Sequence, residues 1–208
     1  MTAVPQRARV LIFTLVLGGG GAEMQALRIA NHLDRKRFDV EVAVLRGGGS
    51  YESALASDVQ FHVLPGKNLI AKAGSLRTLI RRTRPDIVCS FLEVPNLIAA
   101  WASRSVRPRP HVIACVQAPP SITWRGGGLK RLFRAMVSQY YRRAERIIAI
   151  SRGVAEDIAK LAPGAEAHTT TVYNAGVDER LNRLMARPLD TSETRPDAPL
   201  LVACGRLT

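Results

Sequence analysis

The chain has 208 residues, of which 47% are hydrophobic and 23% are charged. This length and composition are typical of a soluble α/β domain with a sizeable core, and they exclude disordered and fibrous classes of protein. Thirty Lys and Arg residues against seventeen Asp and Glu residues give a net charge of +13, which favours anionic partners such as nucleic acid, acidic lipid or phosphorylated substrates.

The aromatic residues bear on whether nucleic acid is a partner, and the cysteines bear on whether the protein has a metal site or disulfides. No basic stretch is interleaved with aromatic residues in the manner of a platform on which bases stack, so we expect no nucleic-acid partner. Cys89, Cys115 and Cys204 each lie in an apolar run, and their spacing fits neither a metal site nor a disulfide framework. We therefore expect core thiols in a reducing, cytoplasmic compartment.

The first predicted elements are a strand at 9–17, a glycine turn and a helix. Arg7 and Arg9 before the apolar run also resemble the start of a secretory signal, but the run is far shorter than the ~20 residues that cross a bilayer, and a helical pattern follows it. Glycine permits a sharp turn and close approach of a ligand, and the free N–H groups of a new helix attract anions. This candidate binding turn consists of Gly18, Gly19, Gly20 and Gly21.

The turn matches known nucleotide-binding motifs only in part. Glu23 stands where the dinucleotide fingerprint has its third glycine, and no Gly-Lys-Ser/Thr follows as in a P-loop. Alternatively, the glycines serve only tight packing of the helix, and Glu23 interacts only with the helix dipole. Arg46 follows the second strand where an acidic ribose partner is expected, which keeps an NADP-binding oxidoreductase as a lesser alternative.

Apolar runs alternate with helical patterns along most of the chain. Strands are predicted at 9–17, 40–45, 60–64, 87–91, 111–116, 146–150 and 169–173. Apolar helical faces are predicted within 22–33, 69–83, 97–101 and 129–140. This alternation predicts an α/β fold, a Rossmann-like parallel sheet with helices on both faces.

Ligands of such sheets bind at the carboxyl ends of the strands. The glycine turn, the segment after Phe91 and the loop at 117–128 are therefore expected to share one crevice. The candidate substrate contacts in the last two segments are Glu93, Asn96 and Gln117. Ser151 directly follows the sixth strand, and we expect it to cap the next helix.

The pattern changes after Asn174. The segment 181–197 is rich in Arg, Pro, Asp and Thr, and an apolar strand then begins without a following helix. A lone strand cannot complete a sheet, so the chain is expected to stop just inside a second domain. We predict an amino-terminal domain at 1–174, an interdomain linker at 175–198 and the first strand of a truncated carboxy-terminal domain at 199–208.

Several short segments, taken in order, resemble the amino-terminal half of a family-four glycosyltransferase of the GT-B fold. They are Gly20-Gly21-Ala22-Glu23, Pro85-Asp86-Ile87-Val88, Ser90-Phe91-Leu92 with Asn96, Ile148-Ala149-Ile150-Ser151 with Val154 and Asp157, Val172 to Asp178, and Leu201 to Thr208. The resemblance spans essentially the whole chain, and the order and spacing of the segments carry it. It implies one half of a two-domain enzyme, the half that mainly holds the acceptor.

The resemblance also implies a reaction. A sugar would pass from a nucleotide diphosphate sugar to a glycan or lipid-linked acceptor with retention of anomeric configuration, and neither a cofactor nor a metal is implied. Arg206 is then expected to contact the donor diphosphate, and the glycine turn to approach the transferred sugar and phosphate.

The chain departs from the family at two places. Many members have a histidine beside the acceptor where this chain has Gln117, which binds hydroxyls but cannot act as a general base. The family's lysine and paired glutamates lie beyond Thr208, so the catalytic residues are not assigned, and we expect this fragment alone to be inactive.

Basic residues gather between Arg125 and Arg146, where seven occur against one acidic residue. Arg131, Arg134 and Arg142 lie opposite an apolar helical stripe, a pattern that fits peripheral docking on an anionic membrane surface and equally a helix that covers a sheet. A non-catalytic module that binds a phosphosugar or anionic polymer at the glycine turn is the alternative function.

Overall fold

The computed structural model describes residues 7–176 and 179–188. The chain divides into two units, 1–174 and 175–208. The first unit is an α/β domain, and the described part of the second contains the helix α7 (Glu179–Met185). This short helix lies in the segment whose sequence pattern predicts a linker.

The first unit is built on one parallel sheet. Its strands are β1 (Ala8–Thr14), β2 (Phe38–Val44), β3 (Gln60–Val63), β4 (Ile87–Phe91), β5 (His111–Val116), β6 (Arg146–Ala149) and β7 (Thr169–Thr171). They pair in the order β3-β2-β1-β4-β5-β6-β7, so the chain winds outward in two directions from the centre. The predicted Rossmann-like α/β fold is therefore confirmed, and the strand order reverses between β1 and β4, the place where sheets of this kind bind ligands at the carboxyl ends of their strands.

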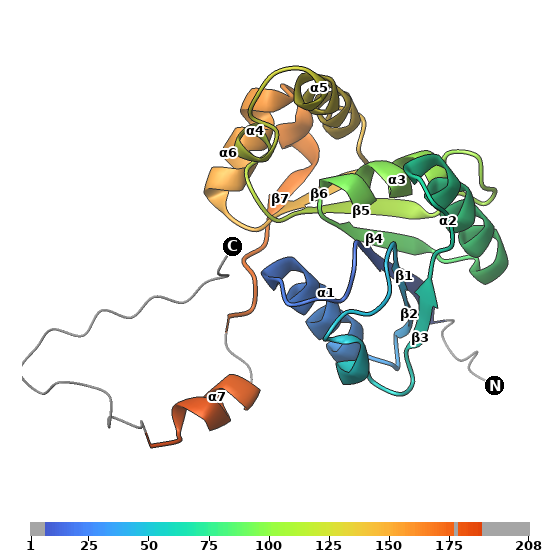
Figure 1. Ribbon diagram of the computed structural model, residues 1–208, viewed down its shortest axis with the longest axis vertical. Coiled ribbons are helices and arrows are strands. Elements are labelled where there is room, and N and C mark those ends of the chain that lie inside the picture. The colour runs from blue at the N-terminus through green and yellow to red at the C-terminus, as the bar shows by residue number, and fades with distance from the viewer. Residues whose placement is uncertain (1–6, 177–178, 189–208) are drawn as a thin grey trace, which may run out of the picture. The chain divides into compact units, whose positions relative to one another are not determined.

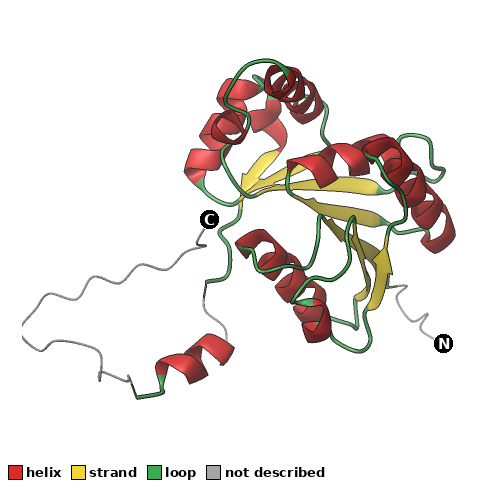
Figure 2. Cartoon of the chain, viewed as in Figure 1, coloured by secondary structure: helices red, strands yellow, loops and turns green. Residues whose placement is uncertain are grey.

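Helices cover both faces of the sheet (Figure 2). They are α1 (Gly21–His32), α2 (Leu69–Thr83), α3 (Glu93–Ser103), α4 (Pro120–Thr123), α5 (Leu129–Tyr141) and α6 (Arg152–Leu161), with 3₁₀ turns η1 (Glu52–Ala54) and η2 (Ala165–His168). Leu11 and Phe13 of β1 pack in one core with α2 and α3, whereas Val10 and Ile12 pack in another with α1 on the opposite face (Figure 1). A third core joins α5 and α6 to β5 and β6.

The first strand ends at Thr14, three residues before its predicted end. Leu15 and Leu17 continue the apolar run, but their carbonyls accept hydrogen bonds from the loop after β2, from the amides of Arg46 and Tyr51 at 2.9 Å each. Leu17 is fully buried. The apolar run is therefore long because its end is buried under a neighbouring loop, and not because the strand extends.

The predicted apolar stripe of α5 is only partly buried. Val137 and Tyr141 are buried in the third core, but Leu129, Leu132 and Met136 are exposed to 75%, 59% and 48%. Only the carboxyl-terminal half of α5 contributes buried residues, so the helix does not cover the sheet along its full length.

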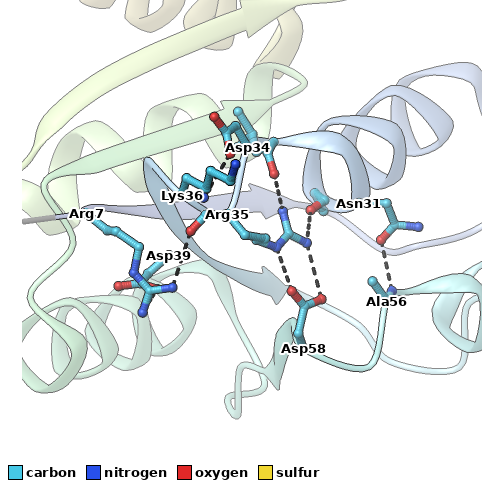
Figure 3. A network of polar contacts seen from close by, with 10 residues as sticks. Arg7, Asn31, Asp34, Arg35, Lys36, Asp39, Ala56 and Asp58 are labelled. Carbon is cyan, nitrogen blue, oxygen red and sulfur yellow. Dashed lines mark hydrogen bonds and ion pairs between the residues drawn. The ribbon is translucent and has the colours of Figure 1, made fainter. Parts of the chain in front are cut away.

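A polar network fixes the end of α1 to the loop that leads into β3 (Figure 3). Arg35 Nε donates to Asp58 Oδ2 at 2.7 Å, and this hydrogen bond lowers the pKa of Asp58. Asn31 Oδ1 accepts from the Ala56 amide at 2.9 Å, and Asn31 Nδ2 donates to the Ala54 carbonyl at 2.8 Å. These contacts hold the carboxyl-terminal end of α1 against the loop before β3.

The thiols of Cys89 and Cys115 lie on adjacent strands with their sulfur atoms 3.5 Å apart, and both are free. The hydrogen bond between the two thiols and burial raise the pKa of the Cys115 thiol. Cys204 lies outside the described residues. Within the described ranges, every helix is too short or too polar to traverse a lipid bilayer.

Gly49 is required by the close approach of two loops. A Cβ at this position would stand 2.0 Å from the Leu17 carbonyl oxygen. We predict that Gly49→Ala lowers the free energy of unfolding by about 1–3 kcal/mol because the two backbones must separate. Gly74→Ala, on α2 with open space around it, is the control and should raise that free energy by about 0.5–1 kcal/mol. Urea unfolding measures both, and equal stabilities of the two variants would contradict the packing described.

Candidate functional site

The glycine turn leaves the carboxyl end of β1 and leads into α1. Gly20 precedes the helix and has no side chain to cap its first amides. A Cβ on Gly19 or Gly21 would meet nothing within 4 Å, whereas one on Gly20 would lie 2.1 Å from a carboxylate oxygen of Glu23. The turn therefore presents open backbone around Gly19 and uncapped helical amides, an arrangement that accepts an anionic group.

A lysine joins the ends of two strands near the glycine turn. Lys72 of α2 donates through Nζ to the carbonyls of Leu45 and Leu64, at the ends of β2 and β3. These contacts hold the half-buried Lys72 at the carboxyl ends of β2 and β3, the same edge of the sheet as the glycine turn. Its sequence position on an ordinary amphipathic helix gave no signal of this role.

The segment after β4 contains a strained backbone and a buried carboxyl group. Leu92 has φ 74° and ψ 156°, a region that is nearly reserved for glycine and that costs about 1–3 kcal/mol for other residues. Glu93 follows it as the first residue of α3 and is only 6% exposed. Burial raises the pKa of Glu93, and its Oε1 has no hydrogen-bond partner among the described residues.

A tyrosine lies within electrostatic reach of this carboxyl group. Tyr141 of α5 is fully buried, and its hydroxyl also lacks a hydrogen-bond partner among the described residues. Burial raises the pKa of Tyr141, and the charge of Glu93 raises it further. Six other described residues also have a buried side-chain polar atom without a partner, so the electrostatic interaction between Glu93 and Tyr141 is what distinguishes this pair.

Asn96 lies beneath Glu93 on α3 and is completely buried. Its Oδ1 accepts from Ser90 Oγ at 2.7 Å, and its Nδ2 donates to the Cys115 carbonyl at 3.4 Å. The amide therefore joins the ends of β4 and β5 from inside the protein. The contacts that Asn96 makes hold the strand ends in place, and its predicted contact with substrate stays a prediction.

Gln117 follows β5 at the same edge and is half-buried. Its Oε1 accepts from Asn174 Nδ2 at 3.2 Å. The loop beyond it is held by Asp157 of α6, whose carboxylate accepts from the amide of Ser121 at 2.9 Å and from its hydroxyl. This anchor went unpredicted, although Asp157 was among the residues that carried the family resemblance.

The sheet order places the three predicted segments at neighbouring strand ends. The glycine turn follows β1, Glu93 follows β4 and Gln117 follows β5, and these strands are adjacent in the order β1-β4-β5. Arg206 and the strand predicted at 199–204 lie outside the described residues. Within 7–176 and 179–188, His, Cys, Asp and Glu residues form no group of three or more that could ligate a metal.

Solved structures share this fold. The chain is similar to Anabaena Alr3699/HepE in complex with UDP-glucose, at a TM-score of 0.67 and 16% identity over 85% of this chain and 49% of that one. It is similar to the lipopolysaccharide outer core galactosyltransferase WaaB, at a TM-score of 0.58 and 14% identity over 82% of this chain and 47% of that one. It is also similar to a UDP-N-acetylglucosamine 2-epimerase from Rickettsia bellii, at a TM-score of 0.58 and 12% identity over 86% of this chain and 48% of that one.

The chain spans about half the length of each of these proteins. The comparison with curated protein sequences finds no match. Residues 19–180, which run from the glycine turn through β7, match the model of Glycosyltransferase Family 4. Because that match covers more than half of the sequence and includes every segment of the candidate site described above, the protein belongs to Glycosyltransferase Family 4.

Proposed function

We propose that the protein transfers a sugar, with retention of anomeric configuration, from a nucleotide diphosphate sugar to a glycan or lipid-linked acceptor. The observation that carries this proposal is the open, uncapped glycine turn at the strand-order reversal, within the segment that matches the family. An anionic diphosphate sugar is the kind of ligand that such a turn accepts. The complex of HepE with UDP-glucose supports a nucleotide sugar as the donor.

The donor would contact the turn at Gly18 to Gly21, where Gly19 offers open space. Arg206 is proposed to bind the donor diphosphate, as the family resemblance implies. The chain spans about half the length of its structural neighbours, so turnover is proposed for the whole enzyme, with this chain supplying the acceptor side.

The acceptor side would be formed by Glu93 and Gln117. Burial raises the pKa of Glu93 and so favours the protonated carboxyl form, which can donate a hydrogen bond to an acceptor oxygen. Gln117 can donate through its amide nitrogen while its oxygen accepts from Asn174. Both contacts position an acceptor hydroxyl without a metal or cofactor.

A lipid-linked acceptor would suit a cytoplasmic enzyme that docks peripherally on the membrane. The exposed apolar residues Leu129, Leu132 and Met136 on the basic helix α5 support this location, because a helix that only covers a sheet would bury them. A phosphosugar-binding module without chemistry is the second candidate function. The open glycine turn supports it equally, so the test must measure turnover.

We predict that Gly19→Val blocks donor binding without unfolding the protein. Release of UDP from UDP-glucose by the full-length protein should be measured with water as the acceptor. The variant should lower this rate by at least about tenfold, which corresponds to 1.4 kcal/mol, while its unfolding midpoint stays unchanged. Gly74→Val is the control, since its Cβ also meets nothing within 4 Å but lies on α2.

Two results would contradict the proposal. Conversion of UDP-N-acetylglucosamine to its 2-epimer without sugar transfer would indicate the activity of the epimerase neighbour. Binding of nucleotide sugars without any turnover by the whole reading frame would indicate the binding module instead.

Glu93→Gln tests whether the buried carboxyl group carries the raised pKa. Below the ordinary pKa of about 4.5, both folded and unfolded Glu93 are protonated, so that wild type and variant should differ least there. As pH rises above this value, the unfolded state releases the proton first, so that wild type loses stability relative to the variant until the folded pKa is passed. Urea unfolding of both proteins from pH 4 to 8 measures the difference, and a difference that is independent of pH would exclude this role.

A further inference from the structure

An apolar trough of about 830 Å³ lies between α2, α3 and α5. Its walls include Leu69, Ile70, Leu97, Trp101, Phe133 and Met136. Four of these are strongly exposed, Leu69 to 48%, Ile70 to 73%, Trp101 to 47% and Met136 to 48%. Contiguous exposed apolar side chains of this kind mark a surface that binds another molecule.

Arginines surround the trough. Arg104, Arg109 and Arg143 line it, and the guanidinium of Arg77 lies 5.4 Å from the centre of the Trp101 ring. Glu145 is the acidic residue among the lining residues, and it is engaged by Arg109 at 2.8 Å. The rim therefore keeps a positive charge that complements an anionic partner.

Arg109 also lines a second, basic pocket of about 600 Å³ at the amino ends of β4 and β5. Arg81 and Arg84 enter this pocket from the end of α2, and Arg107 enters it from the loop before β5. The shared arginine makes the apolar trough and the basic pocket neighbours on one surface. Pro85 follows Arg84 and Pro108 follows Arg107, and each proline limits the freedom of the backbone that carries these arginines.

The arginines of the basic pocket exceed what the surrounding carbonyls and carboxylates use. Asp86 accepts from the Arg9 amide at 2.8 Å, Arg81 Nη2 donates to the Ser105 carbonyl at 3.4 Å, and Arg107 Nη1 donates to the carbonyls of Arg104 at 3.3 Å and Val106 at 3.0 Å. The Arg84 guanidinium has no hydrogen bond or ion pair with any described residue. Guanidinium groups bind phosphate through paired N–H donors, so the pocket offers free donors for a phosphoryl group.

We propose that the basic pocket and the apolar trough together bind one anionic membrane lipid, with its phosphate at Arg84 and Arg107 and its acyl chain along Trp101 and Met136. A free phosphate would use the pocket alone and leave the trough exposed to water, whereas an amphiphile satisfies both parts. The inference deepens the membrane location in the proposed function and rests on it. The phosphate contact lies at the amino ends of β4 and β5, whereas the glycine turn follows the carboxyl end of β1.

The test uses the 208-residue chain and a short-chain phosphatidic acid below its micelle concentration, followed by NMR. Addition of the lipid should shift the Trp101 indole N–H together with the Arg107 and His111 amides, and inorganic phosphate should shift only the two amides and bind more weakly. Arg84→Gln should weaken lipid binding about fivefold, the factor expected for one basic residue at an anionic lipid. Arg82→Gln, which removes an exposed charge from the same helix outside the pocket, should leave binding unchanged.

Three results would overturn the inference. They are no shift with lipid, equal loss of binding in the Arg82 and Arg84 variants, and binding of inorganic phosphate as tight as that of lipid without change at Trp101. The last result would assign the pocket to a soluble phosphate compound. Because no donor sugar enters this experiment, its failure is distinct from failure of the proposed transfer, which is measured by UDP release.

Discussion

The burial of β1 on both of its faces is the constraint on which the rest of the structure depends. A central parallel strand has no solvent-facing side, so its residues must satisfy two helical layers at once, and Val10 to Phe13 are all buried. The chain can leave such a strand only at its carboxyl end, where the sheet order reverses between β1 and β4. The same constraint that builds the two cores therefore also brings the loops of the candidate site to one edge.

Much of the fold follows from the sequence because apolar runs and helical periodicity report burial directly. The predicted strands at 87–91 and 111–116 match β4 and β5 residue for residue. Errors arise where burial has another cause, as at Leu17, which is covered by a loop and not by the sheet. Helical periodicity also does not reveal whether another element packs against an apolar face of a helix. For this reason the exposure of Leu132 and Met136 on α5 could not be predicted.

The candidate site was predictable in its location and only partly in its contacts. Glycines and strand ends are visible in a sequence, but the strain at Leu92 and the unpartnered oxygen of Glu93 depend on how α3 starts under the packing of its neighbours. Asn96 was predicted to contact substrate, but its amide makes hydrogen bonds to Ser90 and Cys115 inside the protein, which the sequence does not reveal. Residue type alone does not separate a group that faces a ligand from one that holds the strand ends in register.

The contact between the glycine turn and the loop after β2 couples two segments that are far apart in the sequence. The Tyr51 amide donates to the Leu17 carbonyl, and Gly49 leaves no space between the two backbones. A displacement of the turn therefore has to carry this loop with it, and the loop in turn meets α1 through Asn31 and the Ala54 carbonyl. The turn, the loop after β2 and the end of α1 are thus connected through hydrogen bonds, and the NMR signal of the Tyr51 amide should change when a ligand binds at the turn.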